Sequence, residues 1–222
     1  MKQLACEAIL FDLDGVLIDS TSCITRHWGQ WADQHGLDLA AVMQAAHGIR
    51  TIETMRLVAP HLDVEQEAER FTALEVTDTE GVVVIDGALP LLQGLPDGVW
   101  AIVTSGSSDL ARARLKRAGL PIPQMLVSGD DVKQGKPAPE PYLVGAAGLG
   151  KAVEDCVALE DAPAGIEAAR AAGMRVIGIT TTHSREELAC AHVVDRLSAL
   201  RILVEEGDRL VVQIEQQNDK GG

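Results

Sequence analysis

The chain is poor in aromatic and basic residues and contains only four cysteines. Phe, Trp and Tyr make up 3% of its 222 residues, so the core must consist mainly of aliphatic side chains. Asp and Glu outnumber Lys and Arg by 33 to 19, for a formal net charge of -14. This excess disfavours nucleic acid and membranes as partners, because both attract clustered Lys and Arg. No Cys-x-x-Cys pair occurs in the sequence, so neither a zinc site nor a redox pair is predicted.

Long apolar runs are also missing. No stretch approaches the ~18 apolar residues of a membrane span, and the N-terminal residues lead into the first predicted strand without an apolar signal region. A cytoplasmic location is therefore expected, with a monomer as the default. Hydrophobic residues make up 46% of the chain, which is enough to bury a core of ordinary size.

The spacing of apolar residues changes near residue 80. Before it, amphipathic spacing predicts helices at 21–35, 39–46, about 51–60 and 64 to about 79. After it, short apolar runs alternate with helices, an alternation expected to continue to the end of the chain. It predicts strands at 82–85, 100–103, 125–127, 156–159 and 175–179.

Strands that alternate with helices imply right-handed crossovers and a parallel sheet covered on both faces. We therefore expect an α/β fold with a Rossmann-like, doubly wound parallel sheet core and an inserted α-helical cap domain. The core comprises residues 1–18 and 80–222, and the cap domain residues 19–79. Residues 216–222 are polar and expected to fray.

Polar residues follow four of the predicted strands. Asp12 and Asp14 come directly after the apolar run 8–11, two residues apart and therefore about 6–7 Å from one another on an extended chain. Two carboxylates at this distance need separate roles, which a divalent cation or a raised pKa can provide. Because the carboxyl ends of parallel strands meet at one edge of a sheet, side chains after the other strands are expected to join them. These are Thr104-Ser105-Gly106-Ser107, Lys136-Pro137 and Glu160-Asp161.

The set contains the parts that phosphoryl transfer needs. It offers a carboxylate nucleophile, hydroxyl and N–H groups at a helix start for an anion, a lysine, and acids that can hold a metal. The transition state of phosphoryl transfer is stabilised mostly by positioning and by charge neutralisation.

The sequence resembles the haloacid dehalogenase superfamily, in its phosphatase branch with a helical cap inserted after the first motif. Each motif alone is weak, but the four in this order are specific. They are Phe11-Asp12-Leu13-Asp14-Gly15, Val103-Thr104-Ser105-Gly106, Gly135-Lys136-Pro137-Ala138-Pro139 and Leu159-Glu160-Asp161-Ala162-Pro163-Ala164-Gly165.

The resemblance implies a role for each acid. Asp12 would attack phosphorus and become an aspartyl-phosphate, while Asp14 would protonate the leaving alcohol and later deprotonate the hydrolytic water. Mg²⁺ would lie between Asp12, the backbone carbonyl of Asp14 and Asp161, with Glu160 reaching it through water. An acid at position 14 is absent from true dehalogenases, so Asp14 favours phosphate esters.

The remaining motifs would bind the substrate. Thr104 and the N–H groups of Ser105 and Gly106 would hold the phosphoryl oxygens, and Lys136 would balance the charge of Asp12 and the phosphate. Lys133 competes for this role, but the Lys-Pro-x-Pro context favours Lys136.

Within the insert, His47-Gly48-Ile49-Arg50 resembles a segment of small sugar-phosphate and glycerol-phosphate phosphatases. We expect these residues to bind substrate, with Arg50 closing over it. The implied function is a Mg²⁺-dependent phosphatase of a small phosphorylated metabolite, such as a sugar phosphate or glycerol phosphate.

Two alternatives remain open. Phosphohexomutases similar to β-phosphoglucomutase carry a histidine soon after the first motif, and here only His27 lies nearby, which we interpret as a residue on the helix surface. A phosphate-sensing or scaffold protein on the same fold is the other alternative, although the presence of both Asp12 and Asp14 argues against it. Trp28 and Trp31 are expected in the cap core, and the basic helix 112–117 is expected to present a solvated face.

Overall fold

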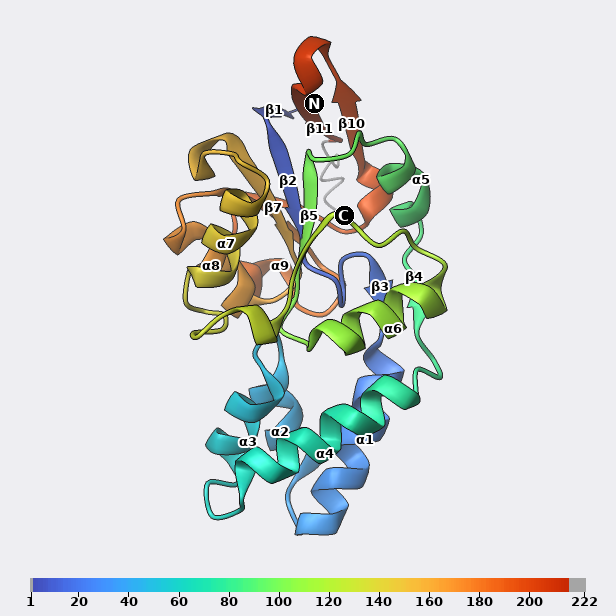
Figure 1. Ribbon diagram of the computed structural model, residues 1–222, viewed down its shortest axis with the longest axis vertical. Helices are drawn as coiled ribbons and strands as arrows, with labels where there is room; N and C mark the ends of the chain where they lie inside the picture. The colour runs from blue at the N-terminus through green and yellow to red at the C-terminus, as the bar shows by residue number, and fades with distance from the viewer. Residues whose placement is uncertain (1, 216–222) are drawn as a thin grey trace, which may run out of the picture.

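The computed structural model describes residues 2–215, so the predicted fraying of residues 216–222 lies outside the described part (Figure 1). Its centre is a parallel six-stranded sheet in the order β6-β5-β2-β7-β8-β9. Strand β2 lies between β5 and β7, with Phe11 opposite Ile102 on one side and Leu159 on the other. The strands are β2 (Ala8–Phe11), β5 (Trp100–Val103), β6 (Met125–Val127), β7 (Cys156–Glu160), β8 (Arg175–Ile179) and β9 (His192–Val194).

Helices cover both faces of this sheet, as the alternating pattern predicts. In β2, Ile9 and Phe11 belong to one apolar cluster and Leu10 to the other, so the strand is buried on both sides. The first cluster includes α5 and α6, and the second includes α7, α8 and α9, which lie on opposite sides of the sheet in Figure 1. These helices are α5 (Ala88–Gln93), α6 (Ser108–Ala118), α7 (Glu140–Gly148), α8 (Pro163–Ala171) and α9 (Arg185–Leu188).

A second sheet lies at the end of the core away from the insert. The expected alternation of strands and helices is wrong for this part of the chain. Strands β1 (Lys2–Cys6), β11 (Leu210–Ile214) and β10 (Leu200–Val204) pair antiparallel in that order. The alternation therefore does not continue to the end of the chain. Only residues 205–209 connect β10 to β11, and this connection is too short for the crossover that parallel strands require.

The helical insert has an apolar cluster of its own. Trp28, Trp31, Met55 and Phe71 are all buried there, as predicted for the two tryptophans. Its helices are α1 (Thr21–His35), α2 (Leu39–Ala46), α3 (Thr51–Val58) and α4 (Val64–Thr77). The two connections to the core pair with each other as the short antiparallel strands β3 (Ile18–Asp19) and β4 (Val83–Val84). Within residues 2–215, no helix has the length and apolar character needed to cross a membrane.

The antiparallel sheet is expected to contribute to the stability of the core, because Leu210 is fully buried in the same cluster as β2. Replacing Leu210 by Ala should lower the free energy of unfolding by about 2–5 kcal/mol, through lost burial and the cavity left behind. Urea unfolding measures the change. Val204→Ala, at a position 43% exposed on β10, is the control and should cost less than about 1 kcal/mol. Equal effects would mean that this sheet is not part of the cooperative core.

Candidate active site

A buried lysine joins two carboxylates at the carboxyl edge of the sheet. Lys136 Nζ donates to Asp12 Oδ1 at 2.5 Å, to Glu160 Oε1 at 2.6 Å and to the carbonyl of Val103 at 3.0 Å. Tyr142 donates its hydroxyl to the same Glu160 oxygen at 2.6 Å. Lys136 is therefore the lysine that reaches Asp12, as its motif predicts, while Lys133 is exposed.

Burial controls the electrostatics of this cluster. Desolvation raises the pKa of Asp12 well above its usual range, with the positive charge of Lys136 opposing the shift. Desolvation and the neighbouring Glu160 raise the pKa of Asp161 to about 7. Three acids thus face one ammonium group, and a divalent cation would stabilise their ionised forms.

The acids of this cluster fit a hard divalent cation. Asp12, Glu160 and Asp161 each offer a carboxylate oxygen, and these atoms lie within 4.8 Å of one another. Oxygen donors are the ligands that Mg²⁺ prefers. Gly15 allows this approach, because its φ is +83° and a Cβ there would lie 1.9 Å from Asp161 Oδ2. Thr182 donates to that same oxygen at 2.5 Å.

Thr182 was not among the site residues predicted from the sequence. The run Thr180-Thr181-Thr182 follows β8 directly, so the rule that identified the other motifs, polar residues after a strand end, also applies to it.

The loop between β5 and α6 borders Asp12. Thr104 is buried, and its Oγ1 accepts a hydrogen bond from the N–H of Gly106 at 3.2 Å. Ser105 donates its hydroxyl to the carbonyl of Gly48 in the insert at 2.9 Å. Thr104 and Ser105 lie beside the carboxyl end of β2, where this role requires them. Their role in binding phosphoryl oxygens stays a prediction.

A cavity of about 120 Å³ lies between the core and the helical insert. Core and insert both contribute to its walls, so a small ligand within it would be enclosed. The core contributes Asp12, Asp14 and Thr104, and the insert contributes Trp28, Met43 and His47.

His47 and Gly48 lie where the insert touches the core. His47 stacks edge-on against His183 with ring centroids 5.0 Å apart, and burial lowers its pKa. Gly48 has a φ of +77°, and a Cβ there would lie 2.9 Å from Cβ of Ala162 in the fourth motif. Both residues line the cavity, as their predicted role requires.

Arg50 occupies a different place from the one expected. It does not line the cavity; its guanidinium instead donates to the carbonyls of Val132 at 3.2 Å and Lys133 at 3.1 Å, and to Glu53 Oε1 at 2.5 Å. Gly135 leaves room for it, because a Cβ there would lie 2.8 Å from Arg50 Nε. In this arrangement Arg50 connects the insert to a core loop.

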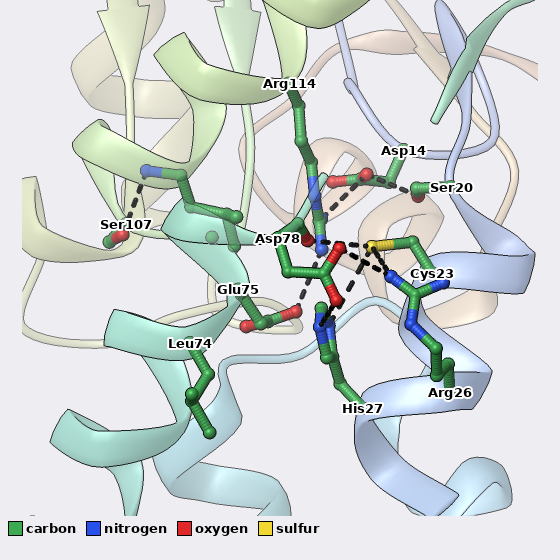
Figure 2. Close-up of polar contacts among 12 residues, drawn as sticks. Asp14, Ser20, Cys23, Arg26, His27, Leu74, Glu75, Asp78, Ser107 and Arg114 are labelled. Atoms are coloured by element: carbon green, nitrogen blue, oxygen red, sulfur yellow. Dashed lines mark hydrogen bonds and ion pairs between the residues drawn. The ribbon is translucent and has the colours of Figure 1, made fainter. Parts of the chain in front are cut away.

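Arg114 is the exception to the solvated face expected of the basic helix, on which Arg112, Lys116 and Arg117 are exposed (Figure 2). It is buried, and its two Nη atoms donate to Asp14 Oδ1 and Glu75 Oε1, each at 2.8 Å. Ser20 also donates to Asp14 Oδ1, at 2.5 Å. Burial raises the pKa of Glu75 to about 7, with Arg114 opposing the shift.

The helical spacing of apolar residues indicates that both Arg114 and Glu75 are buried. The buried positions of α6 are Leu110, Ala111, Arg114 and Leu115, and those of α4 are Val64, Ala68, Phe71 and Glu75. Each charged residue therefore falls on the apolar face of its helix.

His27 lies outside the cavity walls. It is buried, which corrects its expected place on the helix surface, and its Nε2 lies 3.1 Å from Asp78 Oδ2. The network around Asp78 also includes Arg26 and joins α1 to the end of α4 (Figure 2). His27 is thus engaged in the structure of the insert.

Comparison with known proteins identifies the family. A family model for haloacid dehalogenase-like hydrolases matches residues 6–173. The chain belongs to this family.

The curated relatives of this haloacid dehalogenase-like hydrolase include several phosphatases. It is 44% identical to hexitol phosphatase A of Escherichia coli over 79% of this chain and 84% of that protein. It is 36% identical to glycerol-1-phosphate phosphohydrolase 2 of Saccharomyces cerevisiae over 90% of this chain and 86% of that protein. The crystal structure of β-phosphoglucomutase from Clostridium difficile has a TM-score of 0.73 at 23% identity, covering 88% of this chain and 93% of that one, and shares the fold.

The acidic cluster is expected to bind Mg²⁺ in the folded state only. Mg²⁺ at a hundred times its dissociation constant should raise the melting temperature by about 5–10 °C in a chain of this size. Differential scanning calorimetry with MgCl₂ and with EDTA measures the shift. Asp161→Asn should lose most of it, whereas Asp155→Asn, an exposed position just before β7, should keep it. A full shift in the Asp161 variant would place the cation elsewhere.

Proposed function

We propose that the chain is a Mg²⁺-dependent phosphatase that hydrolyses a small phosphomonoester, a sugar phosphate or a polyol phosphate such as glycerol phosphate, through an aspartyl-phosphate. The observation that carries the proposal is the placement of Asp12 and Asp14. Asp12 lies in the buried cluster with Lys136, and Asp14 lines the same small cavity toward the insert. The named phosphatases among the relatives act on compounds of this kind.

Asp12 is proposed as the nucleophile. Lys136 holds its Oδ1, and no hydrogen bond from the described residues occupies its Oδ2, which is left to attack phosphorus. The phosphoryl group would lie against Thr104, Ser105 and Gly106. Mg²⁺ held by Asp12, Asp161 and the carbonyl of Asp14, with Glu160 farther away, would neutralise charge on the phosphoryl oxygens.

Asp14 is proposed as the acid and base. It would donate a proton to the leaving oxygen as the ester bond breaks, and would then take a proton from the water that hydrolyses the aspartyl-phosphate. Ser20 and Arg114 both donate to its Oδ1, so its Oδ2 is the atom available for these transfers.

The cavity favours a compact leaving group. Its space of about 120 Å³ is bounded by Trp28 and Met43 from the insert, so a phosphorylated side chain on a folded protein would not fit beneath them. A lid of this kind also excludes bulk water from the aspartyl-phosphate. His47 and Gly48 would contact the alcohol portion from the same side.

The alternatives are less well supported. A mutase similar to β-phosphoglucomutase would need the histidine that follows the first motif to face the cavity, and the nearby His27 contacts Asp78 outside it. The structural likeness to β-phosphoglucomutase is at the level of fold. A phosphate sensor would have no use for Asp14 beside the nucleophile.

We further propose that residues 1–18 and 80–222 form the catalytic core domain and residues 19–79 a cap domain. The separate apolar cluster of the insert and its two connections through β3 and β4 support this division. A monomer, a cytoplasmic location, and the absence of nucleic-acid and membrane partners stay predictions.

The wild-type protein should release phosphate from p-nitrophenyl phosphate and from glycerol phosphate with Mg²⁺ and not with EDTA. Asp12→Asn should abolish turnover, because an amide oxygen is a poor nucleophile, with the loss reaching at least about 10³-fold. A phosphate-release assay measures both, and circular dichroism checks the fold.

Asp19→Asn is the matched control, an acid near the same loop that caps the start of α1, and it should remain active. Mg²⁺-independent release, or full activity in the Asp12 variant, would refute the proposal. Incubation with glucose 1-phosphate should yield free phosphate; accumulation of glucose 6-phosphate would favour the mutase instead.

A further inference from the structure

A buried row of charges crosses from the insert to the core next to Asp14. Arg114 on α6 lies between Glu75 on α4 and Asp14 after β2, with 2.8 Å to each (Figure 2). The side chains of Arg114 and Glu75 are 4% and 5% exposed, and that of Asp14 is 23% exposed. All three side chains border the cavity, and Asp14 is the most exposed of them.

The guanidinium fixes the orientation of Asp14. One Nη of the planar guanidinium donates to Glu75 and the other to Asp14. The position of Glu75 therefore sets the direction in which the Nη that binds Asp14 points. Ser20 and Arg114 both donate to Oδ1 of Asp14. Oδ2 is left without a hydrogen bond from residues 2–215, and Asp14 lines the cavity in which the leaving alcohol must lie.

The row can form only when the insert rests on the core. Glu75 is near the carboxyl end of α4, Arg114 is near the middle of α6, and the two helices pack against each other. If α4 moved away from α6, Arg114 would lose its partner in the insert. Its buried charge would then be balanced by Asp14 alone, and the fork would be free to turn.

We propose that Arg114 is a positioning residue for Asp14 and that Glu75 makes this positioning depend on closure of the insert. The inference rests on the proposed phosphatase function, with Asp14 as the acid. Proton transfer to the leaving oxygen is then aligned only after the substrate has been enclosed. Neither residue touches phosphorus; each acts through the carboxylate of Asp14.

The leaving group separates this role from a merely structural one. An alkyl alcohol needs a proton as it departs, whereas p-nitrophenolate leaves as a stable anion and needs little help. The ratio kcat/KM includes steps only up to transfer of the phosphoryl group to Asp12. It therefore reports proton donation by Asp14 and not the later hydrolysis of the aspartyl-phosphate. A misplaced acid should therefore affect alkyl phosphates selectively.

The experiment measures kcat/KM with Mg²⁺ for glycerol phosphate, n-propyl phosphate and p-nitrophenyl phosphate. Glu75→Ala should reduce the value for both alkyl esters by at least about tenfold and for the aryl ester by less than about threefold. Glu75→Gln should recover most of the loss, because its amide oxygen still accepts from Arg114. Glu65→Ala is the control on the same helix, since Glu65 pairs with Arg56 at the surface, and it should change none of the three.

Each other outcome contradicts the proposal. An equal fall for all three esters would mean that the row only stabilises the closed form. A fall for glycerol phosphate alone would mean that Glu75 and Arg114 contact substrate hydroxyls, and no fall at all would leave Asp14 independent of them.

Arg114→Lys provides a second test if Glu75→Ala does not fold. An ammonium keeps the charge but lacks the fork, so the same selective loss for alkyl esters is expected. A wild-type protein without Mg²⁺-dependent activity on any of the three would instead refute the proposed function itself.

Discussion

The buried ammonium of Lys136 is the constraint on which the site depends. Its contacts to Asp12 and Glu160 bring together two buried acids that would otherwise repel each other. The sheet order makes this possible, because β2 and β7 are neighbours and their carboxyl ends carry these acids side by side. The small residues Gly15 and Gly165 leave space beside the carboxylates, since a Cβ at either would overlap Asp161 or Glu160. The same arrangement thus gives these residues close packing and a balance of charge.

Asp12 and Asp14 differ in what surrounds them. Asp12 belongs to the core and has a lysine fixed by the core, whereas Asp14 receives Arg114, whose second contact comes from the insert. Asp12, the proposed nucleophile, is therefore held by contacts within the core alone. Asp14, the proposed acid, is held by contacts from both the core and the insert. This arrangement fits a reaction in which Asp12 must be in position at all times and Asp14 must act only in an enclosed space.

The fold and the motif residues were largely predictable because their signals are local. Helix α1 begins at Thr21 and ends at His35 as predicted, since its apolar spacing is regular and Gly36 adopts a φ of +65° that ends it. The strands of the parallel sheet are continuous apolar runs, and the polar residues after them identify the edge. Lys136 was separable from Lys133 by its proline-rich context, and the structure places it against Asp12.

What escaped prediction depends on distant partners. The antiparallel strands β1 and β10 are largely exposed or half-buried, and they pair with the buried strand β11, so that the sheet joins the two ends of the described chain. Arg50 binds backbone carbonyls of a loop more than eighty residues away, which no sequence pattern marks. Arg114 was expected on a solvated face because of its residue type, and Glu75 was not singled out, although the positions of both on their helices place them on buried faces.

We propose that Asp12 carries the phosphoryl group between the two half-reactions. The most direct measurement is an acid quench of the Mg²⁺-loaded protein during turnover of glycerol phosphate, followed by peptide mapping by mass spectrometry. We predict a phosphoryl group on the carboxylate of Asp12. With p-nitrophenyl phosphate, whose leaving group needs little help from an acid, its level should rise when Asp14→Asn slows hydrolysis of the aspartyl-phosphate. Phosphorylation at another residue, or turnover with no phosphorylated protein in either form, would contradict it.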